Sequence, residues 1–185
     1  MHNAILKLDV AGMPVDWITW QTAATLYTRD AVRWEAGSAF FDIVGGYRDD
    51  GQRSRLRICS IVAVQERSRK RPGAWTPPLT NPALFARDGY VCCYCGQLTP
   101  ARLCTRDHVV PKSRGGPDTW ANTATACRGC NGRKRDRTPD EAGMPLLAVP
   151  YVPDPAAYLM LMASRRRVLA DQQAWLETFA KAAPH

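Results

Sequence analysis

The fold of this chain is decided by two short stretches, Cys-Cys-Tyr-Cys-Gly at residues 92–96 and Cys-Arg-Gly-Cys-Asn at residues 127–131. Each contains a Cys-x-x-Cys pair followed by Gly or Asn, as a tight turn around a metal ion requires. Four thiolates in two such pairs are typical of a tetrahedral structural zinc site, with other structure inserted between the pairs. The sequence therefore predicts one structural Zn²⁺ bound by Cys92, Cys95, Cys127 and Cys130.

The cysteine count and the first residues indicate a reducing environment. The chain has seven cysteines, an odd number, and it begins Met-His-Asn-Ala-Ile-Leu-Lys, which does not resemble a secretory signal. We expect a cytoplasmic protein with reduced thiols and without a membrane span. The alternative is that the two Cys-x-x-Cys pairs are unrelated thiol pairs, or that one of them is a redox-active motif. The sequence assigns no role to Cys59, Cys93 or Cys104.

The charge of the chain favours a polyanionic partner. The chain has 25 Lys and Arg against 17 Asp and Glu, a formal net charge of +8. The excess lies in the middle, at residues 51–140, and such a field attracts nucleic acid. We expect some of the basic residues around the motifs to contact DNA phosphates, namely Lys112, Arg114, Arg128, Arg133, Lys134 and Arg135. The alternative is that these residues are solvated surface charges.

Polar residues between the cysteine pairs suggest hydrolytic chemistry. The chain has three histidines, of which two are the second and the last residue, so His108 is the one expected in an ordered site. A neutral imidazole, with an ordinary pKa of about 6.5, suits the removal of a proton from water. Asp107 and Asn131 offer hard oxygen ligands for Mg²⁺ or Mn²⁺, and Asn122 is the candidate to orient the imidazole. Four thiolates leave zinc no open coordination position, so zinc is not the catalytic candidate.

Three stretches carry a family pattern. They are Arg-Asp-Gly-Tyr-Val-Cys-Cys-Tyr-Cys-Gly at 87–96, Thr-Arg-Asp-His-Val-Val-Pro-Lys-Ser-Arg-Gly-Gly at 105–116, and the segment from Asn122 to Asn131. With Arg-Thr-Pro-Asp-Glu-Ala-Gly-Met at 137–144, they resemble the zinc-knuckle HNH endonucleases over residues 81–150. The N-terminal pattern is more weakly similar to the leader of one bacterial and phage branch of that family.

This resemblance implies an α+β fold with a ββα-metal (His-Me finger) core, in which a helix packs across a two-stranded hairpin and zinc clamps the whole. By the resemblance, His108 is the general base and Asn122 orients it, while Asp107 and Asn131 bind a catalytic Mg²⁺ or Mn²⁺. The resemblance also implies DNA cleavage that leaves 5′-phosphate and 3′-hydroxyl ends, in a bacterial or phage-infected cell. The last motif residue of the family is often His, where this chain has Asn131.

The rest of the chain is predicted more coarsely. We expect a small N-terminal β-rich segment at 1–71, a proline-rich connector at 72–82, the nuclease domain at 83–150 and a C-terminal amphipathic helix at 151–185. Strands are expected at 4–10, 31–34, 56–64 and 102–111. Helices are expected at 17–29, 122–135 and 156–182, and a short one from Pro139, where Thr138 and Glu141 form a capping-box pattern.

The C-terminal helix carries apolar residues at seven-residue spacing, Leu161, Val168 and Trp175. This spacing allows a coiled-coil seam and a homodimer, which would bring two active sites to the two strands of DNA. The alternative is that the stripe packs on its own chain, for example on the N-terminal β-rich segment, because Arg165 interrupts the seam.

The function that the sequence favours is metal-dependent hydrolysis of phosphodiester bonds in DNA. The alternative is a zinc-stapled nucleic-acid-binding module without cleavage activity, which would not need the polar set described above. A thiol oxidoreductase, the third possibility, requires a free thiol of low pKa.

Overall fold

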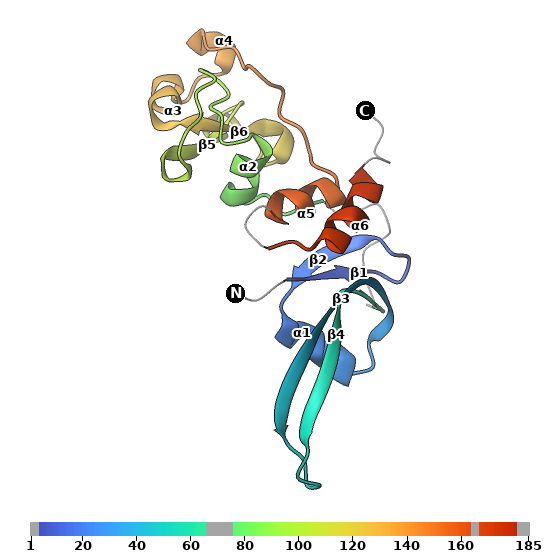
Figure 1. Cartoon of the computed structure of the whole chain (residues 1–185). Coiled ribbons are helices and arrows are strands. Elements are labelled where there is room, and N and C mark those ends of the chain that lie inside the picture. Colours follow the sequence, from blue (N-terminus) through green and yellow to red (C-terminus); the bar gives the residue numbers. More distant parts are fainter. Residues whose placement is uncertain (1–3, 66–75, 164–166, 181–185) are drawn as a thin grey trace. The chain divides into compact units, whose positions relative to one another are not determined.

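The computed structural model describes residues 4–65, 76–163 and 167–180, and the chain divides into two compact units (Figure 1). The first, here called the sheet unit, combines Met1–Trp75 with Pro155–His185, and the second, the cysteine unit, is Thr76–Asp154. The mixed α+β class agrees with the prediction. The N-terminal and C-terminal segments, which are predicted from the sequence as separate parts, belong to one unit. The basic run at 67–71 and the first residues of the expected connector, 72–75, lie outside the described residues.

The sheet unit is built on a four-stranded sheet with the order β2-β1-β4-β3. Its strands are β1 (Ile5–Leu8), β2 (Pro14–Ile18), β3 (Val32–Tyr47) and β4 (Arg53–Val64). The inner half of β4 is buried because β1 lies parallel to it on one side and β3 antiparallel on the other. β3 is much longer than the strand expected at 31–34, because it forms a long hairpin with β4.

Helix α1 (Trp20–Thr28) contributes to the apolar core of this unit. It begins later than predicted because Trp17 belongs to β2, which pairs with β1. Thr19 then caps the helix, since its side chain accepts a hydrogen bond from the backbone N–H of Thr22. The buried residues of this core are Ile5, Ile18, Ala23, Ile58, Cys59, Val62 and Val64.

The expected single C-terminal helix is wrong. The structure has two helices, α5 (Pro155–Ala163) and α6 (Ala170–Ala180), and residues 167–169 before α6 are not helical. A continuous coiled-coil seam through Val168 is therefore wrong as well. Both helices contact the strands of the sheet unit, as the own-chain alternative expected, and homodimerisation stays a prediction. Within the described residues, no helix has the length and apolar character needed to cross a bilayer.

Polar side chains fix α6 to the sheet. The buried Gln172 donates hydrogen bonds to the backbone oxygens of Ala4 and Ser60, at 2.8 and 2.9 Å. The carboxylate of Asp171 accepts a hydrogen bond from the Ser60 hydroxyl at 2.7 Å. Gly37 is required beside this contact, because its φ is +89° and an added Cβ would lie 2.5 Å from Oδ2 of Asp171. The C-terminal segment is thus bound specifically to its own chain.

The cysteine unit contains a two-stranded antiparallel sheet of β5 (Cys104–His108) and β6 (Thr123–Cys127). Its helices are α2 (Asn81–Arg87), α3 (Arg128–Lys134) and α4 (Pro139–Ala142), and its 3₁₀ turns are η1 (Ala101–Leu103), η2 (Lys112–Arg114) and η3 (Trp120–Asn122). The first half of the helix predicted at 122–135 is wrong, because Thr123–Cys127 pairs with β5 as a buried strand. The predicted capping box at Thr138 is confirmed.

A buried arginine ties α2 to β6 and to the end of the cysteine unit. The Arg87 guanidinium donates to the backbone oxygens of Trp120, Thr123 and Tyr151, at 2.9, 2.8 and 2.8 Å. It also forms an ion pair of 2.7 Å with Asp88, whose other oxygen accepts from the backbone N–H of Thr125. These contacts position β6, from which part of the site described next is built.

Candidate active site and metal centre

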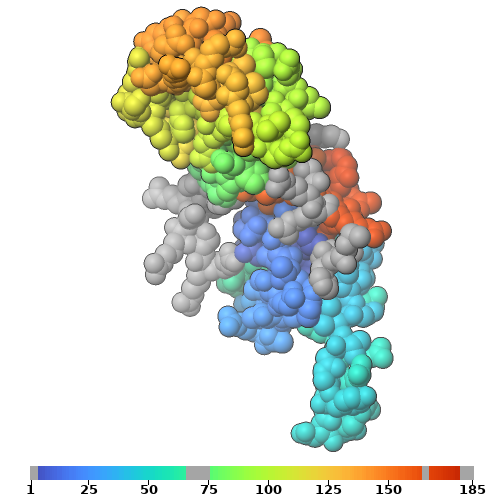
Figure 2. All heavy atoms as spheres, turned by 90° about the vertical axis from the view of Figure 1, so that its left-hand side faces the viewer, coloured from blue at the N-terminus to red at the C-terminus, as the bar shows by residue number. Residues whose placement is uncertain are grey.

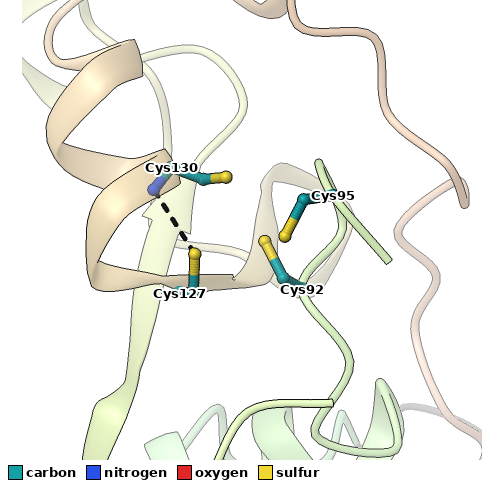
Figure 3. A group of neighbouring side chains, drawn as sticks. All are labelled: Cys92, Cys95, Cys127 and Cys130. Atoms are coloured by element: carbon teal, nitrogen blue, oxygen red, sulfur yellow. Dashed lines mark hydrogen bonds between the residues drawn. The ribbon is translucent and has the colours of Figure 1, made fainter. Parts of the chain in front are cut away.

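The four cysteines of the two Cys-x-x-Cys pairs lie together, with their sulfur atoms all within 4.8 Å of one another (Figure 3). Cys92 and Cys95 come from the loop before η1, whereas Cys127 ends β6 and Cys130 lies in the first turn of α3. The strand-to-helix junction is set by Cys127, whose sulfur accepts a hydrogen bond from the backbone N–H of Cys130 at 3.4 Å. The fold therefore brings the two Cys-x-x-Cys pairs together into one cluster of four thiols.

The cluster has the chemistry of a structural metal site. A tetrahedron with Zn–S distances of about 2.3 Å has sulfur–sulfur edges of about 3.8 Å, which the cluster accommodates. Burial alone would raise the pKa of Cys92, but hydrogen bonds from the backbone of Cys127, Tyr94 and Cys95 lower it to about 7. Burial and the neighbouring thiols raise the pKa of Cys130 to about 12. A cation such as Zn²⁺ would supply the charge that keeps all four sulfurs ionised.

The other three cysteines lie outside the cluster. Burial raises the pKa of Cys93, which packs in the apolar core of the cysteine unit. The thiol of Cys104 donates a hydrogen bond to the backbone oxygen of Thr99 at 3.2 Å, and its pKa is raised by burial. Cys59 belongs to the core of the sheet unit. Cys93 is therefore not part of the four-cysteine cluster, although it follows Cys92 directly in the sequence.

A second site is a surface hollow of about 280 Å³ beside the end of β5. Its lining brings together Asp107 and His108, the last residues of β5, with Asn131 from α3. In the antiparallel pair, Asp107 faces Ala124 and His108 faces Thr123, and α3 packs against both strands. Its other lining residues are Arg106, Pro111, Lys112, Ser113, Arg135 and Asp136.

Asp107 is buried and held by two internal donors. The hydroxyl of Tyr94 donates to its Oδ2 at 2.5 Å, and the Lys134 ammonium lies 3.2 Å from the same oxygen and 3.3 Å from Oδ1. Burial and the hydrogen bond to Asp107 raise the pKa of Tyr94 well above its ordinary value, so this hydroxyl remains a donor. A carboxylate has about four lone-pair positions, so Asp107 retains acceptor capacity toward the hollow.

His108 has an acidic partner that the sequence analysis missed. Its Nε2 lies 2.8 Å from Oδ1 of Asp118, which also pairs with Arg106 at 3.1 Å and Lys112 at 3.5 Å. The hydrogen bond to His108, followed by the charge of Arg106, lowers the pKa of Asp118 to about 2. An ionised carboxylate can only accept, so Nε2 carries the proton and Nδ1 of the neutral ring keeps its lone pair.

Asn122 does not orient the imidazole through a direct contact, contrary to the prediction. Its Oδ1 accepts from the backbone N–H of Val110, and its Nδ2 donates to the backbone oxygens of Val110 and Pro117, at 2.9, 3.0 and 2.8 Å. Gly116 is required in this loop because an added Cβ would lie 1.8 Å from the Val110 oxygen. Asn122 thus closes the loop that leads to Asp118.

Asn131 lines the hollow together with Asp107 and His108. Its Nδ2 donates to the Thr105 hydroxyl at 2.9 Å, which fixes the orientation of the amide. The oxygen is consequently the atom suited to a divalent cation, as the sequence analysis proposed for this residue.

The basic residues predicted to contact DNA divide into two groups. Lys134 is fully buried, and its ammonium donates to Asp107 and to the backbone oxygen of His108 at 2.7 Å, so it is placed as an internal support and not as a surface contact. Arg114 is exposed but pairs with Glu141 at 2.7 Å, and Arg133 donates to the Cys130 sulfur at 3.3 Å. The exposed residues of the set are Lys112, Arg114, Arg128, Arg133 and Arg135.

The family-model match lies within the cysteine unit. Residues 92–147 match a family model described as HNH endonuclease. A solved structure, the crystal structure of the Type II-C Cas9 enzyme from Actinomyces naeslundii, is similar with a TM-score of 0.32 and 18% identity. That match covers 57% of this chain, and the chain spans 11% of the length of that enzyme. A search of curated proteins found no match.

Proposed function

Because residues 92–147 match a family model described as HNH endonuclease, we propose that this chain hydrolyses phosphodiester bonds in DNA with the help of a divalent metal ion. The observation that carries the proposal is the convergence of Asp107, His108 and Asn131 on one hollow. These residues supply a base and two hard oxygen ligands within one small volume. The packing of α3 against the pair β5–β6 supports the proposal that these elements form a ββα-metal core.

The imidazole of His108 acts as the general base. Its Nδ1 accepts a proton from a water molecule, and the resulting hydroxide attacks the phosphorus in line with the leaving 3′-oxygen. The negative charge of Asp118, hydrogen-bonded to Nε2, stabilises the imidazolium that forms. Cleavage of this bond leaves a 5′-phosphate and a 3′-hydroxyl. Asp118 is a positioning residue because it acts through His108.

Asp107 and Asn131 would hold a catalytic Mg²⁺ or Mn²⁺, and such an ion would neutralise charge on the phosphate and on the leaving oxygen. The Lys134 ammonium already faces Asp107, so the positive charge near this carboxylate weakens metal binding by the protein alone. Mg²⁺ sites are commonly completed by substrate phosphates. We therefore expect metal and DNA to bind cooperatively.

The four-cysteine cluster has a structural role in this proposal. A closed shell of four thiolates has no position for water or substrate, so a Zn²⁺ bound there stabilises the unit without taking part in hydrolysis. Cys127 and Cys130 flank the start of α3, and Asn131 follows directly. The zinc site thereby fixes the position of a catalytic-metal ligand.

Incubation of supercoiled plasmid DNA with the zinc-loaded protein and Mg²⁺ or Mn²⁺ tests the proposal. Wild type should nick or linearise the plasmid, and His108→Ala should reduce the rate by roughly 10²–10⁴-fold because the general base is lost. The C-terminal His185→Ala is the matched control and should cleave like wild type. His108→Ala should keep its zinc and its affinity for DNA.

Two outcomes would overturn the proposal. The first is a His108→Ala variant that cleaves at the wild-type rate. The second is a wild-type protein that binds DNA and zinc but does not cleave with either metal, which would favour a zinc-stapled binding module.

A further inference from the structure

The outer part of the β3–β4 hairpin, residues 40–57, is here called the ribbon. It projects from the rest of the sheet unit in Figure 1, and Figure 2 shows it as a separate finger. β1 pairs with β4 at Ile61, Val62 and Ala63, which lie beyond the ribbon. The ribbon is therefore a two-stranded structure, a kind that is only marginally stable on its own in water.

The two faces of the ribbon differ in chemistry. One face carries half-buried apolar residues, Phe41, Ile43 and Leu56, which pack against the core of the sheet unit and anchor the ribbon. The other face carries three exposed arginines, Arg53, Arg55 and Arg57, at every second position of β4. The period-two alternation of a strand places all three on the same side.

The residues opposite these arginines complete a mixed basic and aromatic surface. Arg57 faces Asp42, Arg55 faces Val44 and Arg53 faces Tyr47 across the hairpin. The Arg53 guanidinium lies 5.1 Å from the centre of the Tyr47 ring, and Arg57 lies 4.4 Å from that of Phe40. These contacts hold the Arg53 and Arg57 guanidinium groups against aromatic rings while both remain exposed.

The charge of this face is not neutralised within the ribbon. Asp42 is the acid on the face, and its carboxylate lies 4.0 Å from the Arg57 guanidinium with both side chains more than half exposed. Such a pair is weak and leaves both groups available to other partners. Large apolar groups are also exposed here, with Phe40 at 44%, Val44 at 47% and Tyr47 at 72%. A projecting surface of this composition is typical of a binding site.

We propose that the arginine face of the ribbon binds the phosphate backbone of duplex DNA and adds a second DNA contact to that of the cysteine unit. Successive arginines are spaced by roughly 6.6 Å, two residues of a strand. A DNA strand carries one phosphate per about 3.4 Å of helix axis, so a row of three arginines is long enough to meet more than one phosphate. Arginine is favoured for such contacts because its planar fork binds phosphate oxygens in pairs.

The acids of the hairpin turn restrict how the duplex lies. Asp49 and Asp50 are at the tip, and the carboxylate of Asp50 accepts a hydrogen bond from the backbone N–H of Gln52. These negative charges repel phosphates, so the duplex lies along the strands and not across the tip. The inference rests on the proposed function because DNA is the substrate there, yet binding is measurable without cleavage.

The test compares two double variants of the full chain in a fluorescence anisotropy titration of a labelled DNA duplex, without added Mg²⁺ or Mn²⁺. Arg55→Gln/Arg57→Gln removes two charges from the ribbon. Arg29→Gln/Arg33→Gln removes two exposed charges from elsewhere in the same unit and is the matched control. Arg55→Lys/Arg57→Lys keeps the charge, and thermal melting establishes that each variant is folded.

The ribbon variant should reduce the slope of log affinity against log salt by about 1.8, because each lost phosphate contact contributes about 0.9. At 0.1 M salt this corresponds to a roughly 60-fold weaker affinity. The control should keep the wild-type slope, and the Lys variant should restore most of it. If wild type binds DNA in this way but does not cleave, the proposed function fails and the inference stands.

The inference is overturned if the ribbon variant and the control have the same slope while wild type still cleaves DNA. It is also overturned if wild type binds polyglutamate as tightly as DNA and the ribbon variant loses both affinities equally. In that case the face recognises acidic polypeptides in place of duplex DNA.

Discussion

The two units of this chain are stabilised by different means. Among the described residues, the largest fully buried side chains belong to the sheet unit, with two exceptions in the cysteine unit, Leu84 and Lys134. The apolar cluster that contains the zinc-site cysteines consists of cysteines and small residues together with Met144, and Leu84, Phe85 and Trp120 are buried elsewhere in the same unit. Fewer large apolar side chains are fully buried in this unit than in the sheet unit, so metal binding and buried ion pairs contribute to its stability. The cysteine unit can therefore place charged groups inside, where the sheet unit places Ile and Val.

The largest effect should follow from loss of the metal. Removal of zinc by a chelator, or Cys127→Ser, should destabilise the cysteine unit by on the order of 10 kcal/mol, since structural zinc binding in small domains has that magnitude. Calorimetry should show the loss of one unfolding transition while the transition of the sheet unit remains. Cys104→Ser, outside the cluster, is the control and should retain both. Less than half an equivalent of zinc in the wild-type protein would contradict the claim that metal binding stabilises the cysteine unit.

The next effect should come from the buried ion pair of the cysteine unit. Arg87→Met should destabilise this unit by about 3–5 kcal/mol, because the half-buried Asp88 would lose its ion-pair partner and three buried backbone oxygens would lose their donor. Thermal melting of the zinc-loaded protein measures the change. Arg102→Met replaces an exposed arginine of the same unit and should have little effect. Equal melting temperatures for both variants would show that Arg87 does not stabilise the unit.

A cavity in the sheet unit should affect that unit alone. Leu176 on α6 is 1% exposed, and Leu176→Ala should destabilise the sheet unit by about 2–5 kcal/mol. Hydrogen exchange of each unit, measured by mass spectrometry, should show faster exchange in β1 and β4 and unchanged protection in β5 and β6. Equal acceleration in both units would mean that their stabilities are not separate.

The smallest effect on stability should occur at an exposed polar contact. Asp118→Asn should leave both melting transitions unchanged because its side chain is 43% exposed. The turnover number for DNA cleavage should fall by roughly 10-fold or more, since the hydrogen bond to the charged imidazolium is weakened, while the affinity for DNA stays the same. Asp140→Asn is the matched control. Unchanged turnover in Asp118→Asn would remove Asp118 from the mechanism.

The same division between units explains what the sequence could predict. The cysteine spacing predicted the cluster because metal ligands are fixed by local turns, and the capping box at Thr138 is likewise a local signal. The helix predicted over 122–135 failed in its first half because Thr-Ala-Thr-Ala has weak preferences, and pairing with β5 decides its conformation. Three-dimensional packing of distant segments overrides local propensity at such positions.

The residues that the sequence analysis missed act through long-range contacts. Asp118 reaches His108 only because the loop from Val110 to Pro117 is closed by Asn122. Lys134 was predicted to be a surface residue, as a Lys beside Arg133 and Arg135 usually is, and the structure buries it against Asp107. Its burial depends on where α3 crosses β5, which has no local sequence signal.

The central claim, that Asp107 and Asn131 hold one catalytic metal beside His108, is tested most directly by a Mg²⁺ titration of DNA cleavage. The zinc-loaded wild type is compared with Asn131→Ala and Asp107→Asn, and with Asp140→Ala as the control. Loss of a ligand should raise the Mg²⁺ concentration for half-maximal cleavage by at least about 10-fold without changing the zinc content. An unaltered Mg²⁺ dependence in both variants, with cleavage at the wild-type rate, would contradict the account.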